Sequence, residues 1–448
     1  VETIIEIAAA DTSDVYRQVA TDLTVELWGG TAYSLAVPIN RYYDSAAKDI
    51  PGSAGYGWQL SIRDVNLQLN VPETGRERYG VYSSLRDRSE LYLTTPAGDR
   101  IKFEFAPQIV FEAPAVTYYR PAWQTADPNV DFTLDSVDAL LLRSGNSFYL
   151  VESGVPYHPA NPQLEGSDYV LTGADGTQYH IDSALGIVRQ VTPGGAAVHV
   201  STSGLIADDG SYVDFDRDES GLLRSIQTQD GAAIAYEYDS AGNLIRVQCS
   251  PQSPSAESQC SPQSPSAGAA DGTGTVPATL HSYGYDPAVP HLLRVATGPD
   301  LNQAIFYEAD GITVTPLTAN LGNIADAGGQ RYRGSLATSG AADLYALDVS
   351  QAQLDSVAAG ELWIRVRVLG ISETFRPAIP VVDGAERIIP PGGLDPDAQE
   401  VVAIFKITAP GAYLLSVPAA QAGDYELDVG VAGDINADGR VDGFDSQL

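Results

Sequence analysis

A chain of 448 residues with a formal net charge of −33 and a pI near 4.2 is strongly acidic. Such a charge argues against nucleic acid or an anionic membrane surface as a partner, and it favours cations. The chain has 24 Tyr and 43 Gly, which favours a β-rich, turn-rich protein of roughly two to four domains. No apolar run in the sequence reaches the roughly 18 residues that a membrane-spanning helix needs.

The N-terminal part of the chain carries the first landmarks of a β protein. The sequence starts at Val1 and contains no Met, which predicts that a signal peptide or a larger upstream region comes before it. Residues 41–44 (RYYD) precede residues 55–58 (GYGW), where two glycines let the backbone turn beside a large indole. Trp58 is predicted to pack against a sheet, and stacking on a carbohydrate is the alternative.

Two later stretches, residues 91–105 and 169–182, each read as a strand, a tight turn and a return strand. Their turns contain Gly98 and Gly176, which are strong hairpin signals. The segment between them, residues 107–168, holds two Pro-rich, aromatic connections. These are too apolar for free linkers, so we expect them to pack on the sheet.

One short pattern occurs twice between residues 215 and 247, with every position offset by 21 residues. An Asp bonds the backbone ahead of it, and a Gly shortly afterwards supplies φ > 0, so each copy predicts a tight turn between two strands. The apolar positions that follow have the period of a half-buried strand. The copies are Arg217-Asp218 with Gly221, Leu223 and Ile226, and Tyr238-Asp239 with Gly242, Leu244 and Val247.

This pattern resembles the YD repeat of the RHS family. Weaker copies occupy residues 182–191 and 285–295, and residues 307–311 read as a further return strand. The resemblance implies a long spiralling β-sheet, which closes into a hollow shell in large members of that family. Residues 1–330 are therefore predicted to form an RHS/YD-repeat-like β domain, and an ordinary run of β-hairpins is the alternative.

Residues 250–277 interrupt the repeats with a stretch rich in Pro, Ser, Gln, Ala and Gly. An 11-residue duplication starts at Cys249 and again at Cys260, the two cysteines of the chain. Three states of these cysteines stay open: a disulfide between them in an oxidising compartment, two free thiols, or pairing with cysteines of another chain. We expect the insertion to project from the repeats with the two cysteines close enough to bridge.

From about residue 330 the pattern changes to five strand-like runs, at 345–349, 363–370, 401–407, 412–418 and 425–431. Spacing of this kind suits a β-sandwich. The motifs of a turn followed by a strand that start at Asp343, Gly411 and Gly423 resemble those of the bacterial pre-peptidase C-terminal (PPC) domain. Residues 331–431 are therefore predicted to be a PPC-like β-sandwich, a module that accompanies another function and rarely performs chemistry.

The last segment, residues 432–448, carries explicit site chemistry in the run DINADGRVDGFD. Its oxygen-bearing residues have the spacing of an EF-hand calcium loop, with a Gly at the sharp turn and Asp in place of Glu at the last position. The predicted Ca²⁺ ligands are the side chains of Asp434, Asn436, Asp438 and Asp445, the carbonyl of Arg440, and Asp442 directly or through water. The loop resembles a dockerin repeat, and because a dockerin carries two such loops, either the natural chain continues beyond Leu448 or an incomplete half-module is present, so a cohesin-binding role is not expected from this motif alone. An acidic, solvated tail is the alternative.

The predicted fold class is all-β: a YD-repeat hairpin sheet, then a β-sandwich, then a short EF-hand-like loop. The five histidines are scattered, and no nucleophile-elbow or phosphate-loop motif is present, so we expect a protein that is not an enzyme. We expect a secreted or cell-surface structural, assembly or adhesion protein whose partners are calcium and other protein chains. The alternatives are a fragment of an RHS toxin-encapsulating shell and the accessory carbohydrate-binding part of a larger secreted enzyme.

Overall fold

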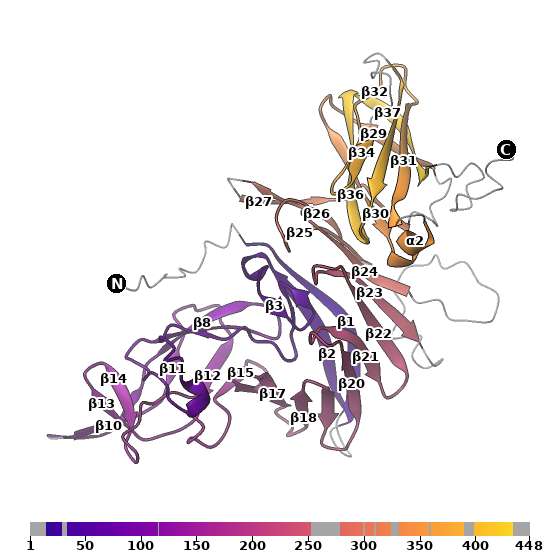
Figure 1. Ribbon diagram of the computed structural model, residues 1–448. Helices are drawn as coiled ribbons and strands as arrows, with labels where there is room; N and C mark the ends of the chain where they lie inside the picture. The colour runs from indigo at the N-terminus through magenta and orange to yellow at the C-terminus, as the bar shows by residue number, and fades with distance from the viewer. Residues whose placement is uncertain are drawn as a thin grey trace.

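The computed structural model describes residues 15–28, 34–114, 116–251, 278–298, 301–308, 311–323, 331–357, 360–388 and 398–432. In these ranges the protein is nearly all β, as the sequence predicts, and its strands form several mostly antiparallel sheets. Figure 1 shows the strands running from the N-terminal sheets through one long sheet to a C-terminal pair of sheets. The described residues include one α-helix, α2 (Gln351–Ser356), which Ser350 caps, and no helix there is long and apolar enough to cross a membrane.

The first sheet is built from β1 (Arg17–Trp28), β2 (Ser34–Asp44) and β5 (Trp58–Leu60). The pairing of β1 with β2 shifts register between Thr21 and Leu23, so Asp22 lies at a β-bulge. A short 3-10 helix, Ser45–Ala47, and a small hairpin of β3 (Pro51–Gly52) with β4 (Gly55–Tyr56) connect β2 to β5. The hairpin formed by β1 and β2 is called the N-terminal hairpin below.

Two four-stranded sheets follow, and the second of them was not predicted. The sequence predicts two Pro-rich, aromatic connections within residues 107–168, whereas much of this segment forms strands with their own apolar core around Phe105, Leu141 and Phe148. A second 3-10 helix, Glu77–Tyr79, precedes β7. The strands are β6 (Gln68–Leu69), β7 (Glu90–Thr94), β8 (Arg100–Phe105) and β11 (Trp123–Gln124), and then β9 (Gln108–Ala113), β10 (Val116–Arg120), β13 (Leu141–Ser144) and β14 (Ser147–Leu150).

The central element is a 14-stranded sheet, called the repeat sheet below, in which β12 and then β15 to β27 pair with one another in chain order. Each neighbouring pair is antiparallel, so the sheet is a chain of consecutive hairpins. Its strands are β12 (Phe132–Ser136), β15 (Tyr169–Gly173), β16 (Gln178–Asp182), β17 (Gly186–Val191), β18 (Ala197–Ser201), β19 (Gly204–Ala207), β20 (Tyr212–Arg217), β21 (Leu223–Thr228), β22 (Ala232–Tyr238), β23 (Leu244–Pro251), β24 (Ala278–Tyr285), β25 (Leu293–Gly298), β26 (Leu301–Glu308) and β27 (Gly311–Pro316).

The repeated motif forms the turns that the sequence predicts. In the first copy the carboxylate of Asp218 accepts hydrogen bonds from the N–H groups of Ser220 and Leu222, and Gly221 has φ +88°. In the second copy Asp239 accepts from Ala241 and Asn243, and Gly242 has φ +81°. A register shift precedes each of these turns, and the apolar residues after them, Leu223, Ile226, Leu244 and Val247, are fully buried.

The C-terminal strands form a β-sandwich, as predicted, with a core shared by its two sheets. All five predicted runs are strands, and the structure adds short ones, including β28, which pairs in parallel with β30. One sheet holds β28 (Ala319–Asn323), β30 (Ala342–Val349), β36 (Gly411–Gln421), β32 (Arg376–Pro377) and β33 (Val381–Val382); the other holds β29 (Arg331–Leu336), β37 (Gly423–Val431), β31 (Leu362–Gly370), β35 (Glu400–Ile407) and β34 (Glu386–Ile388).

The largest core lies between the N-terminal hairpin and one face of the repeat sheet. Leu23 and Ile39 of the hairpin belong to the same buried cluster as Ile226, Ile234 and Val247 of the repeat sheet. Figure 1 shows β1 and β2 beside β20 to β22. One face of the repeat sheet is therefore covered, in this part of the chain, by the chain's own N-terminal strands.

Candidate functional site

The metal and disulfide residues predicted from the sequence are largely not placed by the structure. Asp434, Asn436, Asp438, Arg440, Asp442 and Asp445 all lie outside the described residues, as do Cys260 and residues 252–277 of the insertion. Cys249 is fully buried on β23 and is disulfide-bonded, but its pairing with Cys260 stays a prediction. Within the described ranges, no three His, Cys, Asp or Glu side chains gather as a metal ion would require.

Trp58 is a packing residue, and its burial overturns the sugar-stacking alternative for this side chain. The indole is 0% exposed, and its rings lie 4.6 Å from the ring of Tyr283 and 5.4 Å from that of Tyr43, measured between centroids. Its Nε1 donates a hydrogen bond to the hydroxyl of Tyr285 at 2.8 Å, so the one polar atom of the indole is satisfied inside the core.

A buried ion pair lies beside this indole. Arg41 of β2 donates from Nε and Nη2 to the two carboxylate oxygens of Asp22 on β1, each at 2.6 Å, and both side chains are 0% exposed. The hydroxyl of Tyr236, on β22, donates to the same carboxylate at 2.6 Å. These three residues, with Trp58 and Tyr283, are called the buried arginine centre below.

The aromatic rings of the buried arginine centre surround the guanidinium. Its central carbon lies 5.0 Å from the ring centroid of Trp58, 5.7 Å from that of Tyr236 and 5.6 Å from that of Tyr283, within the range of cation–π attraction. Burial by itself would lower the pKa of Arg41, but the adjacent carboxylate of Asp22 raises it well above its ordinary value. Burial, and next the charge of Asp22, raise the pKa of Tyr236, so this hydroxyl stays a hydrogen-bond donor.

A second buried charge cluster joins the repeat sheet to the sandwich and is called the joint below. Arg246 of β23 donates from Nη2 to Oδ2 of Asp348 on β30 at 2.7 Å, and from Nη1 to Glu237 of β22 at 2.8 Å. Burial raises the pKa of Asp348, and the neighbouring guanidinium opposes that shift. The pair thus fixes the first long strand of the sandwich to the middle of the repeat sheet.

Close backbone packing and apolar contacts complete the joint. A Cβ at Gly284 of β24 would lie 1.9 Å from the carbonyl oxygen of Ala412 on β36, so the two strands meet at a distance that only glycine permits. Val295 and Ala304 of the repeat sheet share a buried cluster with Leu344 and Leu414 of the sandwich. The sandwich is therefore held by packing as well as by charge.

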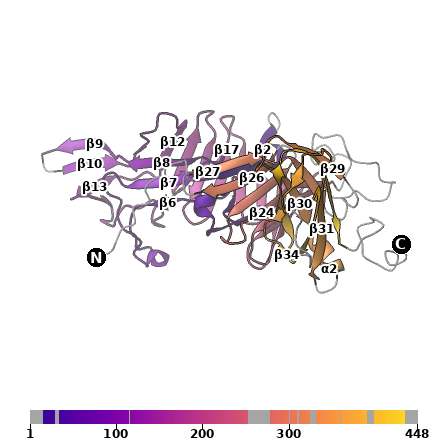
Figure 2. The ribbon, with the colours of Figure 1, turned by 90° about the horizontal axis from the view of Figure 1, so that it is seen from above.

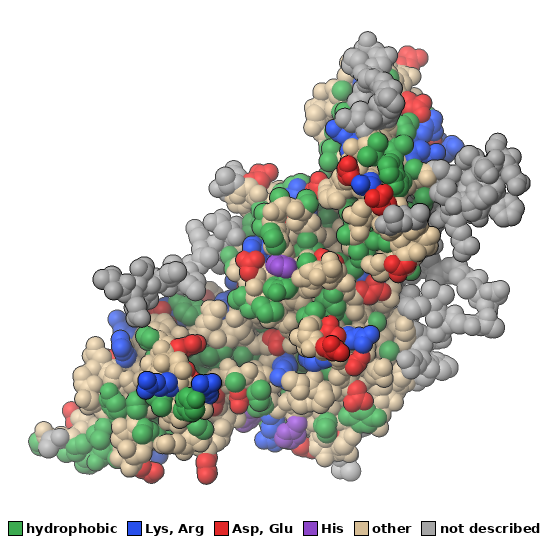
Figure 3. Space-filling model, in the orientation of Figure 1, with side chains coloured by type: hydrophobic (Ala, Val, Ile, Leu, Met, Phe, Trp, Pro, Cys, Tyr) green, Lys and Arg blue, Asp and Glu red, His purple; other side chains and the backbone are tan. Residues whose placement is uncertain are grey.

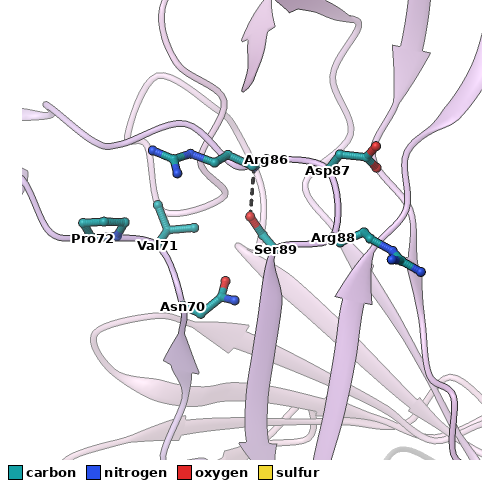
Figure 4. A pocket seen from close by; sticks show the side chains of 7 residues that line it. All are labelled: Asn70, Val71, Pro72, Arg86, Asp87, Arg88 and Ser89. Atoms are coloured by element: carbon teal, nitrogen blue, oxygen red, sulfur yellow. Dashed lines mark hydrogen bonds between the residues drawn. The ribbon is translucent and has the colours of Figure 1, made fainter. Parts of the chain in front are cut away.

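The described part of the surface includes two small depressions. Figure 4 shows one of about 160 Å³, where Asn70 and Val71 face Arg86 and Ser89, and the Ser89 hydroxyl accepts a hydrogen bond from the N–H of Arg86 at 2.9 Å. Pockets for small molecules usually have about 300–1,000 Å³. The depression between β10 and β13, near Tyr119 and Arg143, is larger, about 430 Å³, and open to solvent.

Exposed apolar side chains gather at the end of the molecule that carries β9, β10, β13 and β14. Ile109, Val110 and Phe111 of β9 are 55%, 47% and 52% exposed, and the ring of Phe111 lies 5.8 Å from that of Tyr118. Figure 3 shows hydrophobic side chains at this end, and Figure 2 shows that it lies opposite the sandwich. The exposed ring of Phe111 thus lies at this end, whereas the ring of Trp58 is buried.

Comparison with known proteins gives no family assignment. No family model matches the chain, and no curated protein matches it in sequence. Among solved structures, the N-terminal domain of effector protein SpvB from Salmonella typhimurium strain LT2 is similar over 66% of this chain and 97% of its own, at 11% identity and a TM-score of 0.22. TcdB2-TccC3 is similar over 73% of this chain, at 10% identity and a TM-score of 0.25, and the match spans 17% of its length.

A third structure, an exo-β-1,3-galactanase from Phanerochaete chrysosporium, is similar over 82% of this chain and 95% of its own, at 9% identity and a TM-score of 0.13. TM-scores this low do not establish a shared fold. The resemblance to YD-repeat proteins therefore rests on the residues of the repeats and on the consecutive hairpins that they form.

The sequence did contain a signal for the buried arginine centre. Val37, Ile39, Arg41 and Tyr43 alternate along β2 with the period of a strand, and all four are buried. An arginine at an inward position of such a strand demands a buried partner, because an unpaired charge is costly in a core. The pattern could thus have singled out Arg41, but not Tyr236 or Tyr283, which lie 195 and 242 residues further on.

Proposed function

We propose that this protein is a secreted or cell-surface structural protein without enzymatic activity, which works in assembly or adhesion and carries a calcium-stabilised C-terminal loop. The observation that supports a scaffold role is the way in which the charged side chains are used. Arg246 and Asp348 are buried and join segments distant in the chain, and the buried Asp22, paired with Arg41, accepts a hydrogen bond from the distant Tyr236, so these charges serve to hold the sheets together. A buried pair of charges adds little net stability, and in some proteins it specifies one arrangement of the chain.

Two features support a location outside the cell. Cys249 is disulfide-bonded, and disulfides persist in oxidising compartments. The net charge of −33 keeps such a chain soluble and attracts cations such as calcium. The spacing of oxygen-bearing residues from Asp434 to Asp445 supports calcium as the cation, because alternate side chains of a curling loop supply the six to eight oxygens that this ion prefers.

Calcium binding is tested by titration calorimetry and thermal unfolding of the full chain, with calcium and with a chelator. The wild type is expected to take up calcium and to unfold at a higher temperature with it, since a ligand that binds only the folded form stabilises it. Asp434→Ala is expected to lose both effects. Asp424→Ala, a change in an exposed acidic side chain of β37 outside the loop, is the control and should keep them. No calcium uptake by the wild type would remove the calcium part of the proposal.

A second candidate, a wall fragment of an RHS-type shell, is favoured by the length of the repeat sheet and by its consecutive hairpins. The filled core between the N-terminal hairpin and the repeat sheet supports the solid scaffold instead. Limited proteolysis of the full natural chain distinguishes the two candidates. A polypeptide that resists the protease because a shell encloses it would support the shell. Complete digestion of all flanking sequence would support the scaffold.

A further inference from the structure

The last strand of the repeat sheet, β27, has an edge that no described segment covers. Every strand from β15 to β26 pairs on both sides, whereas β27 pairs with β26 alone. The six residues of β27, GITVTP, carry no charge, although 19% of the chain is charged. Natural edge strands are usually guarded by charged side chains, bulges or a covering loop, because an open edge is a template for another strand.

The hydrogen-bond pattern identifies which groups of β27 point outward. The N–H of Leu317 donates to the carbonyl of Asn302 at 3.0 Å, and the register pairs Gln303 with Pro316 and Ile305 with Val314. Bonded and non-bonded pairs alternate in an antiparallel ladder. Thr315 and Thr313 therefore bond to β26, and the N–H and C=O groups of Ile312 and Val314 point away from it. Pro316 falls at an outward position, where its missing N–H costs the ladder nothing.

The edge is complementary to itself under a two-fold axis. If Thr313 lies opposite Thr313 of a second copy, Ile312 of each copy lies opposite Val314 of the other. The outward groups of these two pairs then form about four main-chain hydrogen bonds. Apolar residues face apolar residues and Thr faces Thr, a cross-strand pairing that stabilises sheets. No like charges meet, in spite of the large net charge of each copy.

We propose that β27 is a self-association edge, at which a second copy of this chain pairs antiparallel to make one sheet that continues through both molecules. The proposal rests on the assembly role proposed above and names its partner. The unbroken β26–β27 register, with six residue pairs and no shift, offers a regular template for this pairing. Each copy carries a charge of −33, so long-range repulsion opposes association in dilute salt.

Analytical ultracentrifugation of the full chain in reducing buffer tests the proposal. The wild type is expected to dimerise, and more tightly as the salt is raised from about 0.1 M to about 1 M, where the screening length falls from about 10 Å to about 3 Å. Val314→Pro removes one outward N–H and leaves the bonds to β26 in place. Thr313→Lys places two lysines opposite each other at the axis. Each variant is expected to raise the dimer dissociation constant at least tenfold.

The matched control is Gln227→Lys, which adds the same charge at an exposed position on β21, a strand paired on both sides. It should dimerise like the wild type, and thermal unfolding should show that all variants are folded. The proposal is overturned if the wild type stays monomeric at every concentration, or if the edge variants dimerise as tightly as the wild type. It is also overturned if a dimer forms only without the reducing agent. A monomeric wild type that still binds calcium leaves the proposed function standing, so the two failures are distinct.

Discussion

Arg41 and Asp22 meet through two hydrogen bonds of 2.6 Å, with no part of either side chain exposed to solvent. Both residues come from the N-terminal hairpin, but the Tyr236 hydroxyl that completes the carboxylate's partners comes from the middle of the repeat sheet. The pair therefore fixes the position at which the hairpin docks. A buried pair of this kind contributes specificity more than net stability, because desolvation offsets most of the attraction.

Removing one partner of this pair is expected to destabilise the protein strongly. Arg41→Met leaves the carboxylate of Asp22 buried without its countercharge, which costs about 3–5 kcal/mol of unfolding free energy. The double variant Arg41→Met with Asp22→Leu removes both charges and is expected to recover most of that loss. Denaturant unfolding followed by tryptophan fluorescence measures both, since Trp58 touches the site. Additive losses in the double variant would mean that the two side chains do not act as a pair.

The two copies of the repeat predict different responses to the same substitution. Gly221 and Gly242 both have positive φ, which is expected to cost an alanine roughly 1–2 kcal/mol. A Cβ at Gly221 meets nothing within 4 Å, whereas at Gly242 it would lie 3.3 Å from the ring of Tyr56. Gly242→Ala should therefore lower the melting temperature more than Gly221→Ala. Equal shifts would show that the ring of Tyr56 moves aside freely.

The parts of the fold that could be predicted are those set by local chemistry. The turns at Asp218 and Asp239 follow from an Asp that caps the backbone and a Gly that takes positive φ, both of which are visible within five residues. The sandwich strands follow from alternation. The strands β9, β10 and β13 were missed because their residues do not alternate between buried and exposed positions, although β9 with β10 and β13 with β14 form local hairpins. The buried arginine centre was missed because the partners of Arg41 come from four separate strands, β1, β5, β22 and β24.

The joint gives a prediction about how the sandwich is attached. Gly284→Ala places a Cβ 1.9 Å from the carbonyl of Ala412, so β24 and β36 must separate. Overpacking of this kind costs about 1–3 kcal/mol, and the loss should fall on the contact between the repeat sheet and the sandwich. Small-angle scattering should show a larger radius of gyration, and protease should cut more readily near Leu317.

The control for the joint is Gly194→Ala, in an exposed turn where the nearest atom to the added Cβ is 3.8 Å away. It should leave scattering and proteolysis unchanged. If Gly284→Ala also leaves both unchanged, the strands at the joint tolerate displacement, and the ion pair of Arg246 with Asp348 holds the sandwich without close backbone packing.

Because His158 is buried in its neutral form, the folded protein is expected to lose stability in mild acid. Burial lowers its pKa from 6.5 to about 4, and the opposing influence of Glu77 is smaller. Its ring stacks on Tyr82, with centroids 4.8 Å apart, and its Nδ1 accepts a hydrogen bond from the N–H of Ala160 at 3.3 Å, which only the neutral ring can do. Between pH 6.5 and about 4 the unfolded chain binds a proton that the folded chain does not, so stability falls as the pH is lowered through this range.

The expected loss from this one group is about 3 kcal/mol over that range, which urea unfolding at a series of pH values can measure. His158→Asn keeps an acceptor for the N–H of Ala160 but cannot take up the proton, so it should flatten the acid side of the profile. His199→Asn, at an exposed position on β18, is the matched control and should leave the profile unchanged. If the free energy of unfolding of His158→Asn falls with pH as steeply as that of the wild type, the acid sensitivity comes from other groups, such as the carboxylates that lose their ion pairs.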